Sequence, residues 1–195
     1  MGMKLVLATA NPNKAREIRE ILEDRVSLIP RPQDVPSPME NGGTVLVNAR
    51  LKAAAVSCAT ALPALADDTG FEIEALHGRP GVDAAYFAGP RATSAENCEK
   101  AIASLRGFPR PEQRRAWLRT VALMRWPSGE ERWHEGACEG IVATAPAGDA
   151  RFGYDSVFIP VEGDGRTFAE LQRYEKHRLS HRRRAFVGLV TQLGI

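Results

Sequence analysis

The sequence lacks the features that would assign it to several common classes. Its three cysteines, Cys58, Cys98 and Cys138, form no C-x-x-C pair, which argues against a disulfide framework or zinc site and favours a reducing compartment. No apolar run approaches the roughly 20 residues that a membrane helix needs, and the chain opens without a signal-peptide pattern. The net charge of +2 is too small to indicate a nucleic-acid partner. We therefore expect a cytoplasmic protein that binds neither membrane nor nucleic acid.

What the 195 residues do contain is the composition of a globular domain, 44% hydrophobic and 26% charged. Apolar runs typical of strands alternate with helical patterns. Strands are expected at 4–8, 26–29, 64–67, 71–73 and 157–159, and helices from Pro12, over 44–60, from Thr93 to about Leu105, and from Ser180 to Leu193. The runs 115–126 and 132–141 flank a Pro-Ser-Gly turn, which predicts a long hairpin. The order predicts one α/β unit with a mixed sheet.

The first segment that can carry chemistry is a strand-to-helix turn made of Thr9, Ala10, Asn11, Pro12, Asn13 and Lys14. Free N–H groups and the positive end of a helix dipole attract phosphate, and Lys14 adds a full charge. The GxxxxGK[ST] pattern of a Walker A loop is missing. The alternative is an ordinary capped helix with a solvated lysine.

Two further segments supply carboxylates. Glu40 lies in a glycine-containing loop before a helix, on which Asn48 and Lys52 are four apart and share one face. Asp67 and Asp68 follow an apolar run, and buried carboxylates need a cation nearby. Hard oxygen ligands favour Mg²⁺, and strand alternation implies that only one of the two aspartates faces it. The alternatives are a solvated loop and a strand that ends in an Asx turn.

Two later segments can recognise a base or an anion. In Phe152-Gly153-Tyr154-Asp155, aromatic faces can stack on a base and the carboxylate can accept from a ring N–H. Equally, both aromatics can be core residues of a strand. The stretch 173–184 is rich in basic residues, part of it at a predicted helix N-terminus. It can bind an anion, form a solvated face or contact nucleic acid.

Taken together and in this order, the segments resemble the inosine triphosphate pyrophosphatase family. Its T/S-x-N-x-x-K motif matches Thr9, Asn11 and Lys14, and its D-D-S/T-G motif matches 67–70. The remaining motifs match Glu40, Gly42, Thr44, Asn48, Ala49, Lys52 and Ala53, then the Gly-Arg-Pro-Gly run at 78–81, the F-G-Y-D run at 152–155, and Glu175, Lys176, Ser180, His181 and Arg182. The matches span nearly the whole chain.

The resemblance implies a hydrolase that converts ITP, dITP or XTP to the monophosphate and pyrophosphate. Glu40 and Asp68 would bind Mg²⁺, Asp68 would also accept the proton of the attacking water, and Asp67 would assist. Lys14 and Lys52 would neutralise phosphate charge. Substrate-binding residues would be Thr9, Ala10, Asn11, Pro12, Asn13, Lys14, Thr69, Phe152, Gly153, Tyr154, Asp155, Lys176, His181 and Arg182.

Base choice follows from hydrogen bonding. Hypoxanthine and xanthine carry a carbonyl oxygen at C6, where adenine carries an amino group. A donor from Lys176, His181 or Arg182 would therefore accept the first two bases and leave adenine unpaired.

The family also implies an ITPase-like fold. It is an α/β domain spanning 1–195, with an elongated mixed sheet flanked by helices and two lobes around a central active-site cleft. The second lobe would be built around the hairpin at 115–141. The resemblance further implies a homodimer, for which Trp117, Trp126 and Trp133 could supply apolar contact area, although they could equally belong to the core.

Four positions depart from the family pattern. Val47 stands where the family usually has Glu, Tyr86 where it often has Arg, Arg151 where it usually has Gly, and Ser156 where it usually has Pro. These departures bear on rate and substrate preference. Three alternatives stay open: a hydrolase of the same fold for another modified nucleotide such as a pyrimidine triphosphate, a nucleic-acid-binding module that uses 173–184, and a catalytically inactive relative.

Overall fold

The computed structural model describes residues 4–40, 42–149 and 152–195, so Arg151 lies outside the described residues. The chain divides into two compact units. The first contains residues 1–68, 120–136 and 182–195, and the second contains residues 69–119 and 137–181. The chain therefore passes from one unit to the other directly after Asp68, and the hairpin expected at 115–141 contributes to both.

The strands form one mixed sheet, which confirms the prediction of an α/β fold. They are β1 (Lys4–Leu7), β2 (Ser27–Ile29), β3 (Ala64–Ile73), β4 (Pro80–Gly81), β5 (Arg115–Arg125), β6 (Glu131–Val142) and β7 (Phe158–Pro160). Their order is β2-β1-β3-β5-β6-β7, and β4 pairs with β3. β1 is parallel to β2 and β3, whereas β6 and β7 are antiparallel. The expected hairpin is the adjacent pair β5 and β6.

In the described part of the chain, the α-helices that flank the sheet are α1 (Pro12–Leu22), α2 (Val45–Thr60), α3 (Ser94–Ser104), α4 (Arg173–Leu179) and α5 (His181–Leu193). The side chains of Asn11, Thr44 and Thr93 accept helix N–H groups at the N-caps of α1, α2 and α3. The backbone N–H of Thr167 donates to Glu170 in a turn that precedes α4, which begins at Arg173. No helix within the described parts of the chain is long and apolar enough to cross a membrane.

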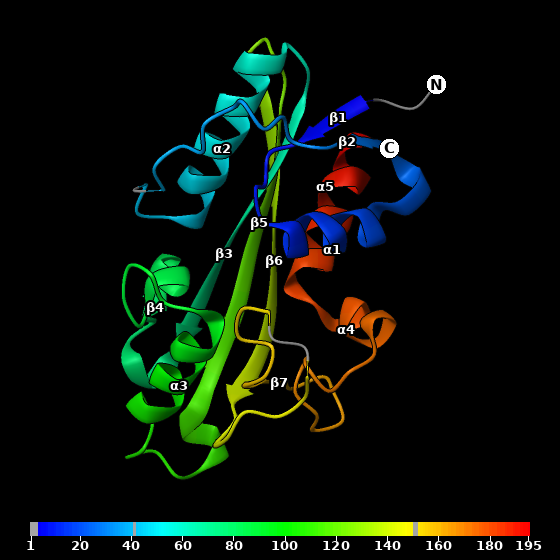
Figure 1. The fold of residues 1–195 in the computed structure, drawn as a ribbon. Helices are drawn as coiled ribbons and strands as arrows, with labels where there is room; N and C mark the ends of the chain where they lie inside the picture. Colours follow the sequence, from blue (N-terminus) through cyan, green and yellow to red (C-terminus); the bar gives the residue numbers. More distant parts are fainter. Residues whose placement is uncertain (1–3, 41, 150–151) are drawn as a thin grey trace. The chain divides into compact units, whose positions relative to one another are not determined.

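In the first unit, helices cover both faces of the sheet. Figure 1 shows α1 and α5 on one side of the strands and α2 on the other. Ile18 and Leu22 of α1 pack with Phe186 and Leu189 of α5 in one buried cluster. The opposite cluster contains Ala49, Ala53 and Val56 of α2. The apolar stripe of α1 is therefore the buried face that fixes this helix on the sheet.

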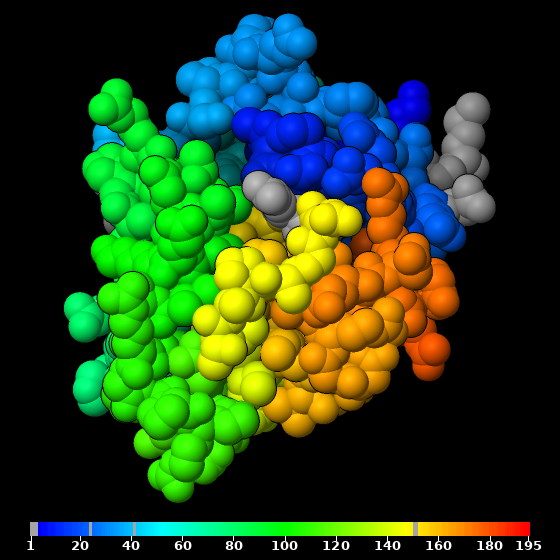
Figure 2. All heavy atoms as spheres, turned by 60° about the horizontal axis from the view of Figure 1, so that its bottom comes forward, coloured from blue at the N-terminus to red at the C-terminus, as the bar shows by residue number. Residues whose placement is uncertain are grey.

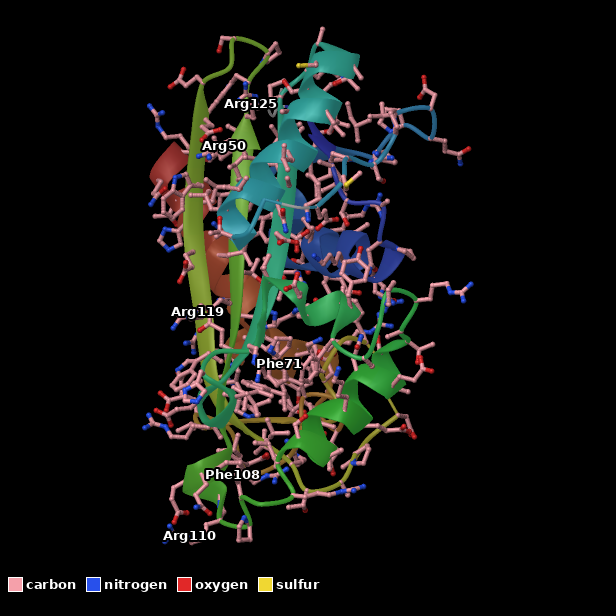
Figure 3. All side chains as sticks on the ribbon, turned by 90° about the vertical axis from the view of Figure 1, so that its left-hand side faces the viewer. Arg50, Phe71, Phe108, Arg110, Arg119 and Arg125 are labelled. Atoms are coloured by element: carbon pink, nitrogen blue, oxygen red, sulfur yellow. The ribbon has the colours of Figure 1, made fainter. Side chains whose placement is uncertain are left out.

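At the turn end of the hairpin, one carboxylate connects α2 to the sheet. Glu131 of β6 accepts from Arg50 of α2 at 2.7 Å and from Arg125 of β5 at 3.2 Å. Figure 3 shows Arg50 and Arg125 near this turn. Of the tryptophans, Trp126 packs on the core beneath α1 and α5, whereas Trp133 is 43% exposed.

The second unit has its own aromatic core. Phe71, Phe158 and Phe168 are fully buried, and Tyr154 stacks on Phe71 with ring centres 4.1 Å apart. Figure 2 shows the yellow segment, residues 144–149 and 152–160, beside the orange segment that leads into α4. Ala169 N–H donates to Asp155 O at 3.1 Å and joins these two segments.

Candidate active site

The two adjacent aspartates lie inside a strand, which corrects one prediction. β3 runs from Ala64 to Ile73 without a break, so the strand does not end at Asp67 and Asp68. The strand continues through Phe71, which is buried in the second unit. The predicted alternation is observed, because the two carboxylates contact different partners.

Asp67 lies among cations. Its Oδ2 is 3.2 Å from Lys14 Nζ and 3.4 Å from Arg182 Nε. Burial by itself would raise the pKa of Asp67, but the charges of Lys14, Arg182 and Lys52 outweigh burial and lower the pKa to about 2. The other carboxylate oxygen, Oδ1, is buried and has no hydrogen-bond partner among the described residues. Asp67 is therefore ionised at neutral pH, with one oxygen able to accept a further hydrogen bond or bind a cation.

Glu17 completes this side of the site, and the sequence reasoning missed it. It is a buried residue of α1 that forms an ion pair with Arg182 of α5. A signal was present, because Glu17 is three residues after Lys14 and precedes the buried Ile18, so it shares a helix face with the lysine. Burial lowers the pKa of Lys14, partly offset by the charge of Asp67.

Asp68 contacts Lys52 and Asn48, the two residues that the sequence places on one face of the helix after Glu40. Its Oδ1 accepts from Lys52 Nζ at 2.7 Å, and its Oδ2 accepts from Asn48 Nδ2 at 3.3 Å. Lys52 Nζ also donates to Glu40 Oε2 at 3.1 Å. Burial raises the pKa of Asp68, more than the Lys52 charge lowers it. For Lys52, burial lowers the pKa, but the carboxylates of Asp68, Asp67 and Glu40 together raise it.

Gly42 holds the Glu40 loop against α2. Its backbone N–H donates to Asn48 Oδ1 at 2.9 Å. A Cβ at Gly42 would lie only 2.4 Å from Cγ1 of Val47, so no side chain fits there. Val47, one of the departures, therefore packs directly on the loop that carries Glu40.

The turn before α1 differs from its prediction in one respect. The sequence predicted free backbone N–H groups here, but those of Asn13 and Lys14 donate to Asn11 Oδ1 and are not available to phosphate. Thr9 Oγ1 accepts from the N–H of Asn11. Donors at this turn are therefore the side chains of Thr9, Asn11 and Lys14. Ala10, Pro12 and Asn13 lie at the surface of the turn, Asn13 being half-buried.

The second unit brings together residues expected at the base. Lys176 Nζ lies 2.5 Å from Asp155 Oδ2 and 5.5 Å from the centre of the Phe152 ring. Tyr154 takes the core alternative, because its ring stacks on Phe71 and its hydroxyl donates to Ala84 O at 2.8 Å. Its ring therefore supports the turn from below, and Phe152 is the aromatic side chain that is only half-buried.

Three other expected residues each have different surroundings. His181 is buried in the second unit and stacks on Phe168, with ring centres 6.4 Å apart. Arg182, expected to bind the base, instead pairs with Asp67 and Glu17 in the first unit. Thr69 is half-buried on β3, directly after Asp68.

Glu40 and Asp68 can bind a hard divalent cation if the substrate supplies the remaining ligands. Glu40 and Asp68 both contact the Lys52 ammonium, so these two carboxylates already share one cation. Within the described ranges, no three His, Cys, Asp or Glu side chains converge as a metal site. Mg²⁺ fits such a pair, since it is commonly held by one or two carboxylates together with substrate phosphates and water.

Fold and site together define a class of α/β proteins in which buried acids on a central strand of a mixed sheet pair with cations from the flanking helices. The chain belongs to the Ham1 family, whose sequence pattern matches residues 5–192. A dITP/XTP pyrophosphatase from Thermus thermophilus is 44% identical, over 97% of this chain and 91% of that protein. One from Gluconobacter oxydans is 40% identical over 97% and 90%.

Solved structures of Ham1 proteins have the same fold as this chain. A HAM1 protein from Coxiella burnetii has a TM-score of 0.87 at 37% identity, covering 98% of each chain. The Ham1 protein of Staphylococcus aureus has a TM-score of 0.84 at 32% identity, with the same coverage. The similarity therefore extends over nearly the whole fold, and the family match covers residues 5–192.

Proposed function

We propose that this chain hydrolyses dITP, ITP and XTP to the nucleoside monophosphate and pyrophosphate. One observation carries the proposal. Three carboxylates are each paired with a lysine. Glu40 comes from the loop before α2, and Asp67 and Asp68 come from opposite faces of β3. Alternating acids and ammonium groups suit a triphosphate with its metal, because each charge on the ligand meets its opposite. Relatives over 40% identical carry the name dITP/XTP pyrophosphatase, which supports the same activity here.

We propose that Glu40 and Asp68 hold Mg²⁺. When bound, the ion would polarise the phosphate oxygens and favour attack at phosphorus. Asn48 donates to Asp68 and keeps its carboxylate oriented. Lys52, now between the two acids, would then be free to turn one of its three donors towards a phosphate oxygen.

The chain's own groups supply the remaining steps. Asp68 accepts the proton of a water molecule while the water oxygen attacks the α-phosphorus. The bond between the α-phosphorus and the leaving pyrophosphate then breaks. Lys14 neutralises charge on the phosphates, held in place by Asp67. Thr9 and Asn11 donate to phosphate oxygens from the turn before α1. Arg182 is held by Glu17 and Asp67, and we propose that its positive charge acts on the phosphates rather than on the base.

For the base, we propose Phe152 as stacking partner and Lys176 as the donor to a C6 carbonyl oxygen. Lys176 donates to Asp155, and its ammonium group carries three N–H donors. His181, on its stack with Phe168, stays a second candidate donor. Gly153 and Tyr154 contribute through the backbone of their turn, and Thr69 contributes from β3. The whole chain then acts as one catalytic domain.

We further propose a homodimer in the cytoplasm, with the exposed Trp133 in the contact. Analytical ultracentrifugation measures this directly. A Trp133→Ala variant should shift the protein towards monomer, whereas a wild type that sediments as a monomer at micromolar concentration contradicts the dimer.

The decisive experiment measures pyrophosphate release from ITP, XTP, dITP, GTP, ATP and a modified pyrimidine triphosphate, with and without Mg²⁺. We expect release from the first three nucleotides only when Mg²⁺ is present. Asp68→Asn should lower kcat by at least about a hundredfold, while Asp164→Asn, an exposed acid on a loop, should leave it unchanged. Preferential pyrimidine hydrolysis, no hydrolysis, or tight salt-dependent oligonucleotide binding would favour one of the alternatives instead.

A further inference from the structure

A hydrogen-bonded chain connects α3 to the turn that carries Phe152 and Asp155. The Cys98 thiol donates to the carbonyl oxygen of Gly153 with an S–O distance of 3.3 Å, and the Ser156 hydroxyl donates to the Cys98 sulfur at 3.7 Å. Cys98 is buried, and this burial raises the pKa of its thiol. The sulfur therefore keeps its proton, so each donor has a fixed direction, from serine to sulfur and from thiol to carbonyl.

The carbonyl that receives this bond is the one that decides the form of the turn. Asp155 N–H donates to Phe152 O at 3.1 Å and closes a four-residue turn, in which Gly153 is second with a φ of 58°. Turn types differ mainly in the rotation of the central peptide, and its oxygen is that of Gly153. Glycine opposes this rotation less than any other residue. A donor on this oxygen therefore selects one form of the turn.

The same stretch of α3 holds the neighbouring segment too. Asn97 donates through its side-chain amide to Ala85 O at 3.0 Å and accepts from Ala88 N–H at 2.7 Å. Tyr154 OH donates to Ala84 O at 2.8 Å, which joins this segment to the turn. Helix α3, the segment around residue 85 and the turn are thus bonded to one another within the second unit, so α3 is a rigid support.

We propose that Cys98 is a positioning residue for base recognition. By fixing the Gly153 peptide, it holds the Phe152 ring at a constant distance from the Asp155–Lys176 pair. A base must stack on Phe152 and hydrogen-bond to this pair, so the distance between them sets the apparent affinity for the nucleotide. Cys98 itself touches no substrate. The inference rests on the proposed function.

The kinetic test compares two buried cysteines of the same core cluster, Cys98 and Cys138. Cys98→Ala should raise KM for ITP about fivefold, the effect of one neutral hydrogen bond, with kcat within about twofold. Cys98→Ser keeps a donor and should restore KM. Cys138→Ala removes the same atoms elsewhere in the core and should leave KM unchanged. An unchanged KM in Cys98→Ala, an equal rise in Cys138→Ala, or no recovery in Cys98→Ser overturns the inference.

A second measurement is independent of activity. The exchange rate of the Asp155 amide hydrogen reports the closed turn, because this N–H is bonded to Phe152 O. We expect about fivefold faster exchange in Cys98→Ala than in Cys138→Ala. Equal rates in the two variants overturn the inference, whatever the enzyme does. A wild type that releases no pyrophosphate from any nucleotide, with the exchange difference present, refutes the proposed function and leaves Cys98 as the support of the turn.

Discussion

Asp67 and Asp68 are adjacent on β3, yet each carboxylate pairs with a different lysine. Asp67 is 3.2 Å from Lys14 of α1, and Asp68 is 2.7 Å from Lys52 of α2. Successive side chains of a strand point to opposite faces, and this unit has a helix with a lysine on each face. The two acids therefore have separate electrostatic environments, one with a lowered pKa and one with a raised pKa.

The lowered pKa of Asp67 predicts a specific acid sensitivity. Its pKa is about 2 in the folded protein against an ordinary 3.8, so the ionised carboxylate stabilises the fold by roughly 2 kcal/mol. This stabilisation is complete above the ordinary pKa and is lost as the pH falls towards 2. Urea unfolding from pH 5 to 2 should show a steeper loss for the wild type than for Asp67→Asn. Parallel curves would contradict the assignment.

Lys176 is predicted to discriminate between bases. Lys176→Met removes the donor proposed for the C6 carbonyl, so the ratio of ITP to ATP turnover should fall about tenfold. The exposed Arg178 lies on the same helix, and Arg178→Met is the matched control for loss of charge. Steady-state kinetics with both nucleotides measures the ratio. If it is unchanged in Lys176→Met, or falls equally in the control, Lys176 does not read the base.

Glu17 is predicted to act on catalysis through Arg182. Glu17→Gln keeps the shape of the side chain but removes the charge that holds the guanidinium, so kcat/KM for ITP should fall about tenfold. Glu20→Gln, one turn later on α1, is the control and should stay near wild type. Circular dichroism establishes that both variants fold. Equal activity of the two variants would show that the Glu17–Arg182 pair has a structural role only.

Arg114 is predicted to be essential for stability rather than activity. Its guanidinium is buried and donates to four backbone carbonyls, those of Leu105, Phe108, Val142 and Ala143. Arg114→Met leaves these oxygens without their donor and should cost roughly 3 kcal/mol in urea unfolding. Arg110→Met, on the exposed side chain labelled near Phe108 in Figure 3, should cost less than about 0.5 kcal/mol. Similar costs would contradict the role of Arg114.

Much of the fold follows from local sequence. The N-caps Asn11, Thr44 and Thr93 and the apolar stripe of α1 are short-range signals, and all are observed. The error at Asp67 has a physical cause. Two adjacent carboxylates are unfavourable inside a strand unless cations neutralise them, and those cations come from α1, α2 and α5, which no local pattern reveals.

The sequence by itself determined the order of most strands and helices, because hydrophobic periodicity and capping depend on neighbouring residues. It divided β3 into two strands and did not predict α4. Motif spacing also predicted Lys14, Glu40, Lys52, Asp67, Asp68 and Arg182, which the structure joins by ion pairs, but not Glu17. Only the tertiary structure decided how they pair: that Arg182 binds Asp67 and Glu17, that Tyr154 is a core residue, and that Cys98 supports the turn at Gly153. These pairings join residues from 55 to 165 positions apart, and such contacts depend on how whole elements pack.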